Sequence, residues 1–214
     1  MLENYSRLLA LESTIYAVPN MIQKLTPDLI ESTARLHREV LVGTLNSRAG
    51  LWFVKRLYAG MVSFSDNGYC FVAVENTSVV GFISFGLDRS KLDAQIMASL
   101  GSAEKVRVGL SLVFRPWLLP ALIRQRLFSR YLRTKVRPGP FILTLGVSPI
   151  MQGHGVGKRL VDWAKDEVRS AGFTELFVDT EVENTGAVAF YKKIGFQYVA
   201  TVQGNIILSC PLKK

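Results

Sequence analysis

The stretch PFILTLGVSPIMQGHGVGKRLVDWAKDEVRSAG, residues 140–172, decides the fold. Its first eight residues, 140–147, are almost continuously apolar, which predicts a strand buried on both faces of a sheet. From Gly155 onward the apolar residues recur at the helical period, at Val156, Leu160, Val161, Ala164 and Val168. The stretch therefore predicts a buried strand, a glycine-rich turn and a helix, in that order.

Three glycines, Gly153, Gly155 and Gly157, stand at every second position between that strand and that helix. The first N–H groups of a helix lack partners within the helix, and the helix dipole favours an anion beside them. Glycine lets a ligand approach the backbone closely and permits unusual φ values. The turn therefore predicts either a phosphate site or simply a tight connection between strand and helix.

Two familiar phosphate motifs do not fit this turn. A dinucleotide fingerprint reads G-x-G-x-x-G, whereas the third glycine here comes one residue early. A P-loop needs four residues between its glycines and then Lys-Ser/Thr, whereas Gly153 and Gly157 enclose three and Arg159 stands where the hydroxyl belongs. The turn supports neither a nucleoside-triphosphate enzyme nor a Rossmann dehydrogenase.

The rest of the chain alternates strand and helix signals. Strands are predicted at 21–25, 69–75, 79–85, 175–182, 196–202 and 205–209, and helices at 29–43, 47–61 and 185–194. Thr26-Pro27-Asp28 is a typical helix start, and Asn76-Thr77-Ser78 and Gln203-Gly204 are predicted hairpin turns. This order predicts one α/β domain over residues 1–214 with a central mixed sheet.

Composition limits the chemistry and the compartment. The chain has two cysteines and two histidines, all far apart in sequence, so we expect no disulfide framework and no metal site. We find no signal peptide and no run of about 18 apolar residues that could span a membrane. These features predict a cytoplasmic protein.

The excess of positive charge is confined to one insert, residues 88–138. Between Arg89 and Arg137 there are 11 Lys/Arg and 2 Asp/Glu, a net of +9 that equals the net charge of the whole chain. Its arginines Arg126, Arg130, Arg133 and Arg137 recur at steps of four, three and four, which places them on one helical face. The sequence does not predict nucleic-acid binding, because the excess cations lie in one partly apolar segment without a nucleic-acid-binding motif.

Three interpretations of the insert stay open. It could be a helical flap that packs on the domain and leaves its arginines solvated. It could cover an acceptor cleft and attract an anionic substrate. It could also contact an anionic membrane peripherally through 106–137, because basic residues mixed with Trp, Phe and Leu are typical of interfacial helices.

Two motifs together resemble the GNAT N-acetyltransferase superfamily. QGHGVG, residues 152–157, is similar to the Q/R-x-x-G-x-G/A loop of that family, and it follows LTLGVSP. NTGAVAFYKKIGF, from Asn184 onward, resembles the family's second signature. The resemblance covers residues 141–202, extends by element order to 21–85, and is absent from the insert. It implies the GNAT fold, a mixed and mostly antiparallel sheet that is splayed in the middle and flanked by helices.

The resemblance also implies a site for acetyl-CoA. The backbone groups of Leu145 and Val147 would bind pantetheine, and Asn184 and Tyr191 would face the pantetheine arm and the sulfur. Gln152 would line the loop. The pyrophosphate would be held by the backbone N–H groups of Gly153, His154, Gly155, Val156, Gly157 and Lys158. His154 could equally face solvent, and Lys158 could be an exposed cation of the first helical turn.

In this comparison Tyr191 is the candidate general acid. A phenol titrates near 10 and a thiol near 8.5, so a tyrosine stays protonated at neutral pH and can donate to the leaving thiolate. It could instead be an aromatic that fills space between helix and sheet. The general base is not assigned among six candidates, namely His37, Glu39, Glu75, Asp179, Glu181 and Glu183.

The function implied by the resemblance is transfer of an acetyl group from acetyl-CoA to a primary amine by direct attack, without a metal. One alternative is a non-catalytic module that binds or senses acyl-CoA. Another is an acyltransferase at a membrane surface that acts on a lipid- or nucleotide-linked aminosugar. The sequence predicts a small-molecule amine acceptor, anionic if the insert attracts it, and it predicts no oligomeric state.

Overall fold

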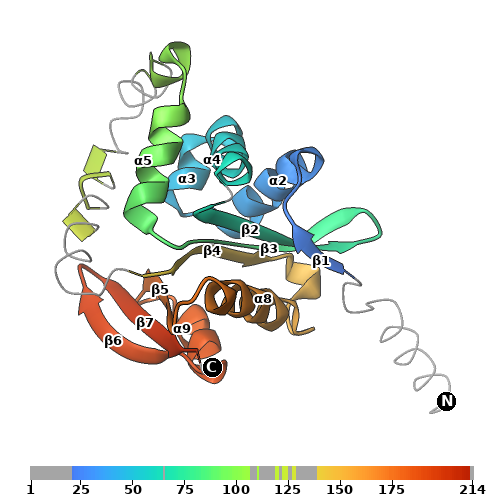
Figure 1. Cartoon of the computed structure of the whole chain (residues 1–214), viewed down its shortest axis with the longest axis vertical. Coiled ribbons are helices and arrows are strands. Elements are labelled where there is room, and N and C mark those ends of the chain that lie inside the picture. The colour runs from blue at the N-terminus through green and yellow to red at the C-terminus, as the bar shows by residue number, and fades with distance from the viewer. Residues whose placement is uncertain are drawn as a thin grey trace.

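The computed structural model of the chain describes residues 21–64, 66–106, 110, 119–120, 122–124, 127–128 and 139–212. Its centre is a seven-stranded sheet in the order β1-β2-β3-β4-β5-β7-β6 (Figure 1). The strands are β1 Met21–Lys24, β2 Gly68–Glu75, β3 Ser78–Gly86, β4 Phe141–Val147, β5 Glu175–Glu181, β6 Gln197–Val202 and β7 Asn205–Pro211. All neighbouring strands are antiparallel except β4 and β5, which run parallel.

Helices cover both faces of the sheet (Figure 1). On one face lie η1 Pro27–Leu29, α2 Ile30–Val40, α3 Leu45–Ala49, α4 Leu51–Ser63 and α5 Arg89–Ser99. On the other lie α8 Val156–Ser170, which follows the short η3 Pro149–Met151, and α9 Thr185–Lys193. The mixed α/β fold that the sequence predicts is confirmed.

The insert begins with a helix that belongs to the core. Leu92 and Ile96 of α5 are buried among residues of α4 and β2. Gly68 and Gly86 make room for Leu92, because a Cβ at either position would lie 2.7 or 3.0 Å from its methyl carbons. The start of the insert therefore packs on the domain, while Arg126, Arg130, Arg133 and Arg137 lie outside the described residues.

The sheet splits between its two parallel strands. β4 and β5 pair at only two positions, Phe141 with Phe177 and Ile142 with Val178. Beyond Ile142 the strands diverge, as the sequence comparison predicts. Leu143 has no partner on β3 either, because Ser84 pairs with Thr144 and the next residue, Phe85, pairs with Ile142. A β-bulge in β4 therefore coincides with the start of the split.

Three local predictions differ from the structure. The helix predicted over 47–61 is broken into α3 and α4 at Gly50, whose φ of 109° does not fit a helix. Thr26 begins a 3₁₀ turn without a side-chain capping bond. β4 packs against the apolar cores on both faces of the sheet, but it is less completely buried than predicted, because Leu143–Leu145 are only half-buried.

In the described part of the chain, no helix has the length and apolarity needed to cross a bilayer.

Candidate active site

The opening between β4 and β5 receives backbone groups from β4. Just past β4, the Ser148 N–H donates to the Val80 carbonyl at 2.8 Å, so this residue faces β3. Successive residues of a strand direct their backbone groups to opposite sides. Leu145 and Val147 therefore direct their N–H and C=O groups away from β3 and toward the opening.

The glycine loop places further N–H groups at the end of β4. Gly153 and Gly155 have φ values of 82° and 79°, which glycine adopts without steric cost. The first backbone bond of α8 runs from the Arg159 N–H to the Gly155 carbonyl at 3.1 Å. The N–H groups of Val156, Gly157 and Lys158 precede it and find no carbonyl within the helix. The arrangement is suited to binding an anion.

Three side chains of the loop make polar contacts within the protein that the sequence does not predict, namely those of Gln152, His154 and Lys158. Gln152 Nε2 donates to the Val147 carbonyl at 3.2 Å, so the carbonyl of Val147 is already used while its N–H faces the opening. His154 is exposed, and its Nδ1 lies 3.0 Å from the Gln152 carbonyl oxygen. Lys158 Nζ lies 2.6 Å from a carboxylate oxygen of Asp162. Gln152 therefore ties the loop to β4.

α9 begins at the same edge of the sheet as α8, because each helix follows one of two parallel strands. Asn184 caps α9, and its Oδ1 accepts from the Ala187 N–H at 3.1 Å. The first turn of α8 also meets the second half of α9, where a Cβ on Gly157 would lie 3.4 Å from Cζ of Phe190. Asn184 therefore has a structural role in the helix whether or not it contacts a ligand.

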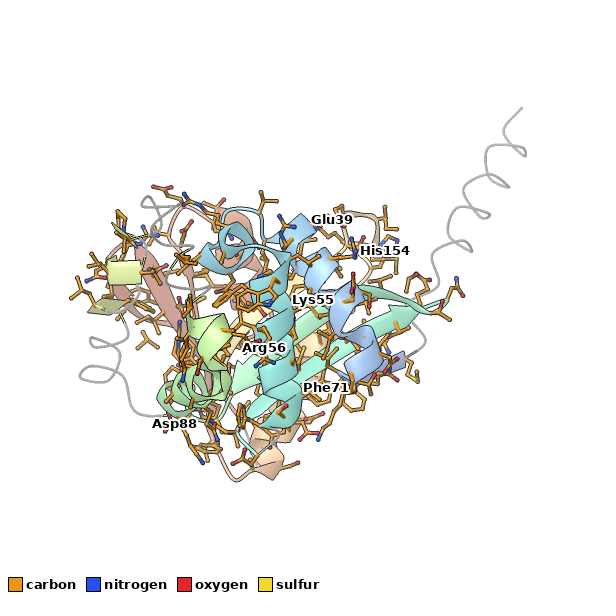
Figure 2. The ribbon with its side chains drawn as sticks, turned by 90° about the horizontal axis from the view of Figure 1, so that it is seen from above. Glu39, Lys55, Arg56, Phe71, Asp88 and His154 are labelled. Atoms are coloured by element: carbon orange, nitrogen blue, oxygen red, sulfur yellow. The ribbon has the colours of Figure 1, made fainter. Side chains whose placement is uncertain are left out.

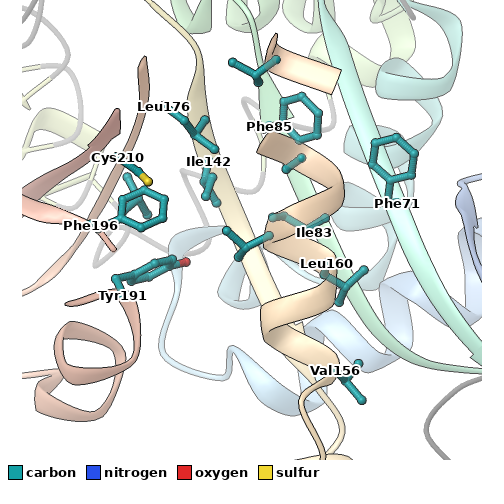
Figure 3. Close-up of a cluster of buried hydrophobic side chains, with 14 of the residues drawn as sticks. Phe71, Ile83, Phe85, Ile142, Val156, Leu160, Leu176, Tyr191, Phe196 and Cys210 are labelled. Carbon is teal, nitrogen blue, oxygen red and sulfur yellow. The ribbon is translucent and has the colours of Figure 1, made fainter. Parts of the chain in front are cut away.

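Tyr191 is almost buried beside the opening. Its side chain contacts Phe190 and Phe196 edge to face, with ring centroids 5.2 Å apart in each case. In Figure 3 the ring lies beside Phe196 and the hydroxyl points toward β4 and α8. Within the described residues this hydroxyl has no hydrogen-bond partner. Burial, and secondarily the charge of Asp179, raise the pKa of Tyr191 well above its usual value.

Asp179 is the first residue of β5 beyond its pairing with β4. Its carboxylate accepts from Arg89 Nη1 at 2.8 Å, and both side chains are about one-fifth exposed. The Arg89 guanidinium also lies 5.2 Å from the centroid of the Phe141 ring. Asp179 therefore lies where the sheet splits, and among the six candidate bases its charge is the one that acts on Tyr191.

The other five candidate bases lie elsewhere. His37 is only 1% exposed, so an amine substrate does not reach it. Glu39, on the same helix α2, is exposed. Glu75 lies at the hairpin turn between β2 and β3, and Glu181 and Glu183 are exposed at the end of β5 and beyond it. In Figure 2 the loop residue His154 and Asp88, where the insert starts, lie far apart, so the glycine loop and the start of the insert are on different sides of the molecule.

We predict that His37 makes the folded protein sensitive to mild acid. Burial lowers the pKa of His37 from 6.5 to about 4, so the unfolded chain binds one more proton between these values. Stability is therefore complete above pH 6.5 and is lost as the pH falls through this window, by about 3 kcal/mol at pH 4. Urea denaturation of the wild type and His37→Gln between pH 7 and pH 4 measures this loss. An equal acid dependence in both proteins would contradict the prediction.

Residues 122–196 match the sequence model of the Acetyltransferase (GNAT) family. N-alpha-acetyltransferase 30 of Saccharomyces cerevisiae is 38% identical over 61 residues, 28% of this chain and 35% of the relative. The [ribosomal protein bS18]-alanine N-acetyltransferase of Salmonella typhimurium is 28% identical over 81 residues, 33% of this chain and 55% of the relative. The matched segments thus span from about a third to just over half of the length of these two curated relatives.

Solved structures share the fold over nearly the whole chain. A putative GNAT-family acetyltransferase from Desulfovibrio desulfuricans has a TM-score of 0.59 at 15% identity, over 90% of this chain and 99% of that one. The PaiA N-acetyltransferase of Thermoplasma acidophilum, in complex with coenzyme A, has a TM-score of 0.57 at 14% identity, over 89% and 98%. At these identities the likeness establishes the fold.

Proposed function

Because this chain has the GNAT fold and residues 122–196 match the GNAT family in sequence, we propose that it is an acyl-CoA-dependent N-acyltransferase that transfers acetyl to a primary amine. The observation that carries the proposal is the coincidence of two features at one edge of the sheet. The split between β4 and β5 opens where the first N–H groups of α8 lie. An anion held there can place an attached chain along the free edge of β4.

Acetyl-CoA has the shape and charge that this edge can bind. In the proposal its pyrophosphate accepts from N–H groups between Gly153 and Lys158, with support from the helix dipole. The pantetheine amides pair with the backbone of Leu145 and with the N–H of Val147, and Asn184 lies beside the same arm. The thioester then lies near Tyr191, beside the point where the sheet splits.

The reaction is a direct acyl transfer in this site. The amine nitrogen forms a bond to the thioester carbonyl carbon, and a backbone N–H of β4 that faces the opening beside the thioester donates to the oxygen that becomes negative. The C–S bond then breaks, Tyr191 donates its proton to the thiolate, and the proton of the attacking amine passes to solvent or a nearby base. Holding both reactants in one site contributes roughly 7–11 kcal/mol toward lowering the barrier.

Release of free coenzyme A from acetyl-CoA across a panel of amines tests the proposal. The panel includes aminosugar nucleotides, polyamines and aminoglycosides as small acceptors. It also includes peptides with free N-termini, because two relatives are named as an N-alpha-acetyltransferase and as a ribosomal-protein-alanine N-acetyltransferase. Amine-dependent release is expected. Binding of coenzyme A without release for any amine would instead support the non-catalytic binding module.

We also propose that the insert contacts anionic membranes peripherally. Of its described residues, Val106, Leu110, Leu119, Ile123 and Leu127 are apolar and between 44% and 60% exposed. They lie in the segment that carries the net charge of +9, which complements anionic lipid. Free buried thiols at Cys70 and Cys210 fit a reducing compartment, so we place the protein at the cytoplasmic side.

The membrane contact predicts flotation with vesicles that contain phosphatidylglycerol. Binding should be strong at low salt and weak at about 1 M salt, where the Debye length is about 3 Å. Replacing Ile123 and Leu127 by Gln should reduce flotation at low salt, because their exposed side chains would insert at the interface. Equal flotation with neutral and anionic vesicles would contradict the electrostatic part of the proposal.

A further inference from the structure

The bulge in β4 controls which backbone groups reach the opening. Leu143 is the extra residue, and it lies immediately beyond the last pair between β4 and β5. If β4 slipped by one residue to remove the bulge, every later residue would exchange sides. Leu145 and Val147 would then direct their N–H groups toward β3 instead of the opening. The direction of these groups therefore depends on how firmly the bulge is held.

Two hydroxyl groups hold the strands together beside the bulge. Ser84 Oγ and Thr144 Oγ1 lie 2.5 Å apart, across the pair that flanks Leu143. Ser84 is fully buried, so its hydroxyl depends on this partner rather than on water. A slip of β4 would separate the two hydroxyl groups.

The same bond is connected to the helices above the sheet. The phenol of Tyr58 on α4 lies close to the Thr144 side chain, and it is 2.8 Å from His37 Nδ1 on α2. Tyr58 and His37 are 2% and 1% exposed. Both rings pack on Phe82, the residue that pairs with Gly146 of β4. Side chains from α2, α4, β3 and β4 thus form one polar chain that ends at the bulge.

We propose that this chain of His37, Tyr58, Thr144 and Ser84 fixes the bulge and thereby aims the Leu145 and Val147 N–H groups at the bound acyl-CoA. The four are positioning residues, because none reaches the opening to touch the ligand. The inference rests on the proposed function for its ligand, but the bulge itself can be tested without one. Buried polar groups lose hydration, so a register that separates the paired hydroxyl groups is disfavoured, although His37 Nε2 has no partner among the described residues.

Two substitutions interrupt the chain at different links. Tyr58→Phe keeps the ring and removes the hydroxyl, and Thr144→Val keeps the shape and removes the other hydroxyl. Tyr69→Phe is the matched control, because it also removes a phenol hydroxyl, but Tyr69 stacks on Phe85 at 5.1 Å in the core on the opposite face of the sheet from Tyr58. Two readouts are needed, namely calorimetric affinity for coenzyme A and hydrogen exchange of the β4 amides in the protein alone.

Each interrupting variant should bind coenzyme A about 10- to 100-fold more weakly than Tyr69→Phe, because a shift near 1 Å misplaces the donors. The amides of Thr144 and Gly146 should exchange faster in both. The double variant should bind coenzyme A no more weakly than the weaker-binding single variant, because both substitutions interrupt the same polar chain of side chains. A role in stability alone would lower Tm without changing the affinity of the folded protein.

The outcomes separate this inference from the proposed function. If the wild type does not bind coenzyme A, the proposed function fails, and β4 exchange alone decides whether the chain holds the bulge. If the wild type binds, and both variants match Tyr69→Phe in affinity and in exchange, the inference is overturned while the function stands. If Tyr58→Phe does not fold, Thr144→Val decides by the same two readouts.

Discussion

Gly157→Val is expected to weaken the affinity for coenzyme A about 100-fold while Tm changes little. Gly157 has no positive φ, and a Cβ there would make only ordinary contacts, 3.4 Å to Phe190 and 3.6 Å to Val147. The fold therefore has room for a Cβ at this position. A diphosphate on the N–H groups of the first helical turn would be displaced, and loss of one or two charge-assisted hydrogen bonds costs about 3 kcal/mol. Calorimetric titration and thermal melting measure the two effects.

Two further variants make this result specific. Gly186 is the second residue of α9, as Gly157 is of α8. Gly186→Val therefore measures how much valine in the first turn of a helix lowers Tm. Gly155→Ala should lower Tm by several degrees as well as the affinity, because φ is 79° there and an L-residue is strained by about 1–2 kcal/mol. If Gly157→Val binds coenzyme A as tightly as the wild type, the glycine turn is a connection and does not hold the pyrophosphate.

Most of the fold could be predicted from the sequence because local signals and burial agree. The apolar period of α8 corresponds to its five buried residues, Val156, Leu160, Val161, Ala164 and Val168. The predicted turns at Asn76-Thr77 and Gln203-Gly204 are confirmed, with positive φ at all four residues. Such signals depend on a few neighbouring residues, so a single sequence reveals them.

The features that were missed depend on distant partners. Continuous apolarity in 140–147 predicts a strand buried on both faces, and β4 does pack against both cores. Leu143–Leu145 are nevertheless only half-buried, and that depends on where β5 diverges. The prediction of one continuous helix over 47–61 was wrong for a more local reason. A single glycine inside a helical pattern is often tolerated, so Gly50 alone does not indicate a break.

The candidate site was predicted unevenly for the same reason. The glycine loop and Tyr191 lie within local motifs. The bond from Gln152 to Val147 and the polar chain from His37 to Ser84 were missed. His37 on a predicted amphipathic helix gives a weak signal of burial, but nothing in the sequence pairs it with Tyr58, 21 residues away.

At Tyr191, substitution by Phe should lower kcat about 100-fold and leave the affinity for coenzyme A unchanged. A positioned general acid contributes about 10²- to 10⁴-fold. Burial raises the pKa of Tyr191, which keeps the phenol protonated at every practical assay pH but makes complete transfer to a thiolate near 8.5 unfavourable. The lower end of the range is therefore expected. Steady-state kinetics measure kcat, and Tyr198→Phe, with a side chain 58% exposed, is the control.

The stability of Tyr191→Phe separates catalysis from packing. Among the described residues its hydroxyl has no partner, so removal should leave Tm unchanged while the ring still packs on Phe190 and Phe196. Because the pKa is raised, Tyr191 stabilises the fold below pH 10, and this contribution is lost as the pH rises further. Tyr191→Phe should therefore resist alkali better than the wild type. Unchanged kcat together with that resistance would make Tyr191 a core residue and leave solvent to protonate the thiolate.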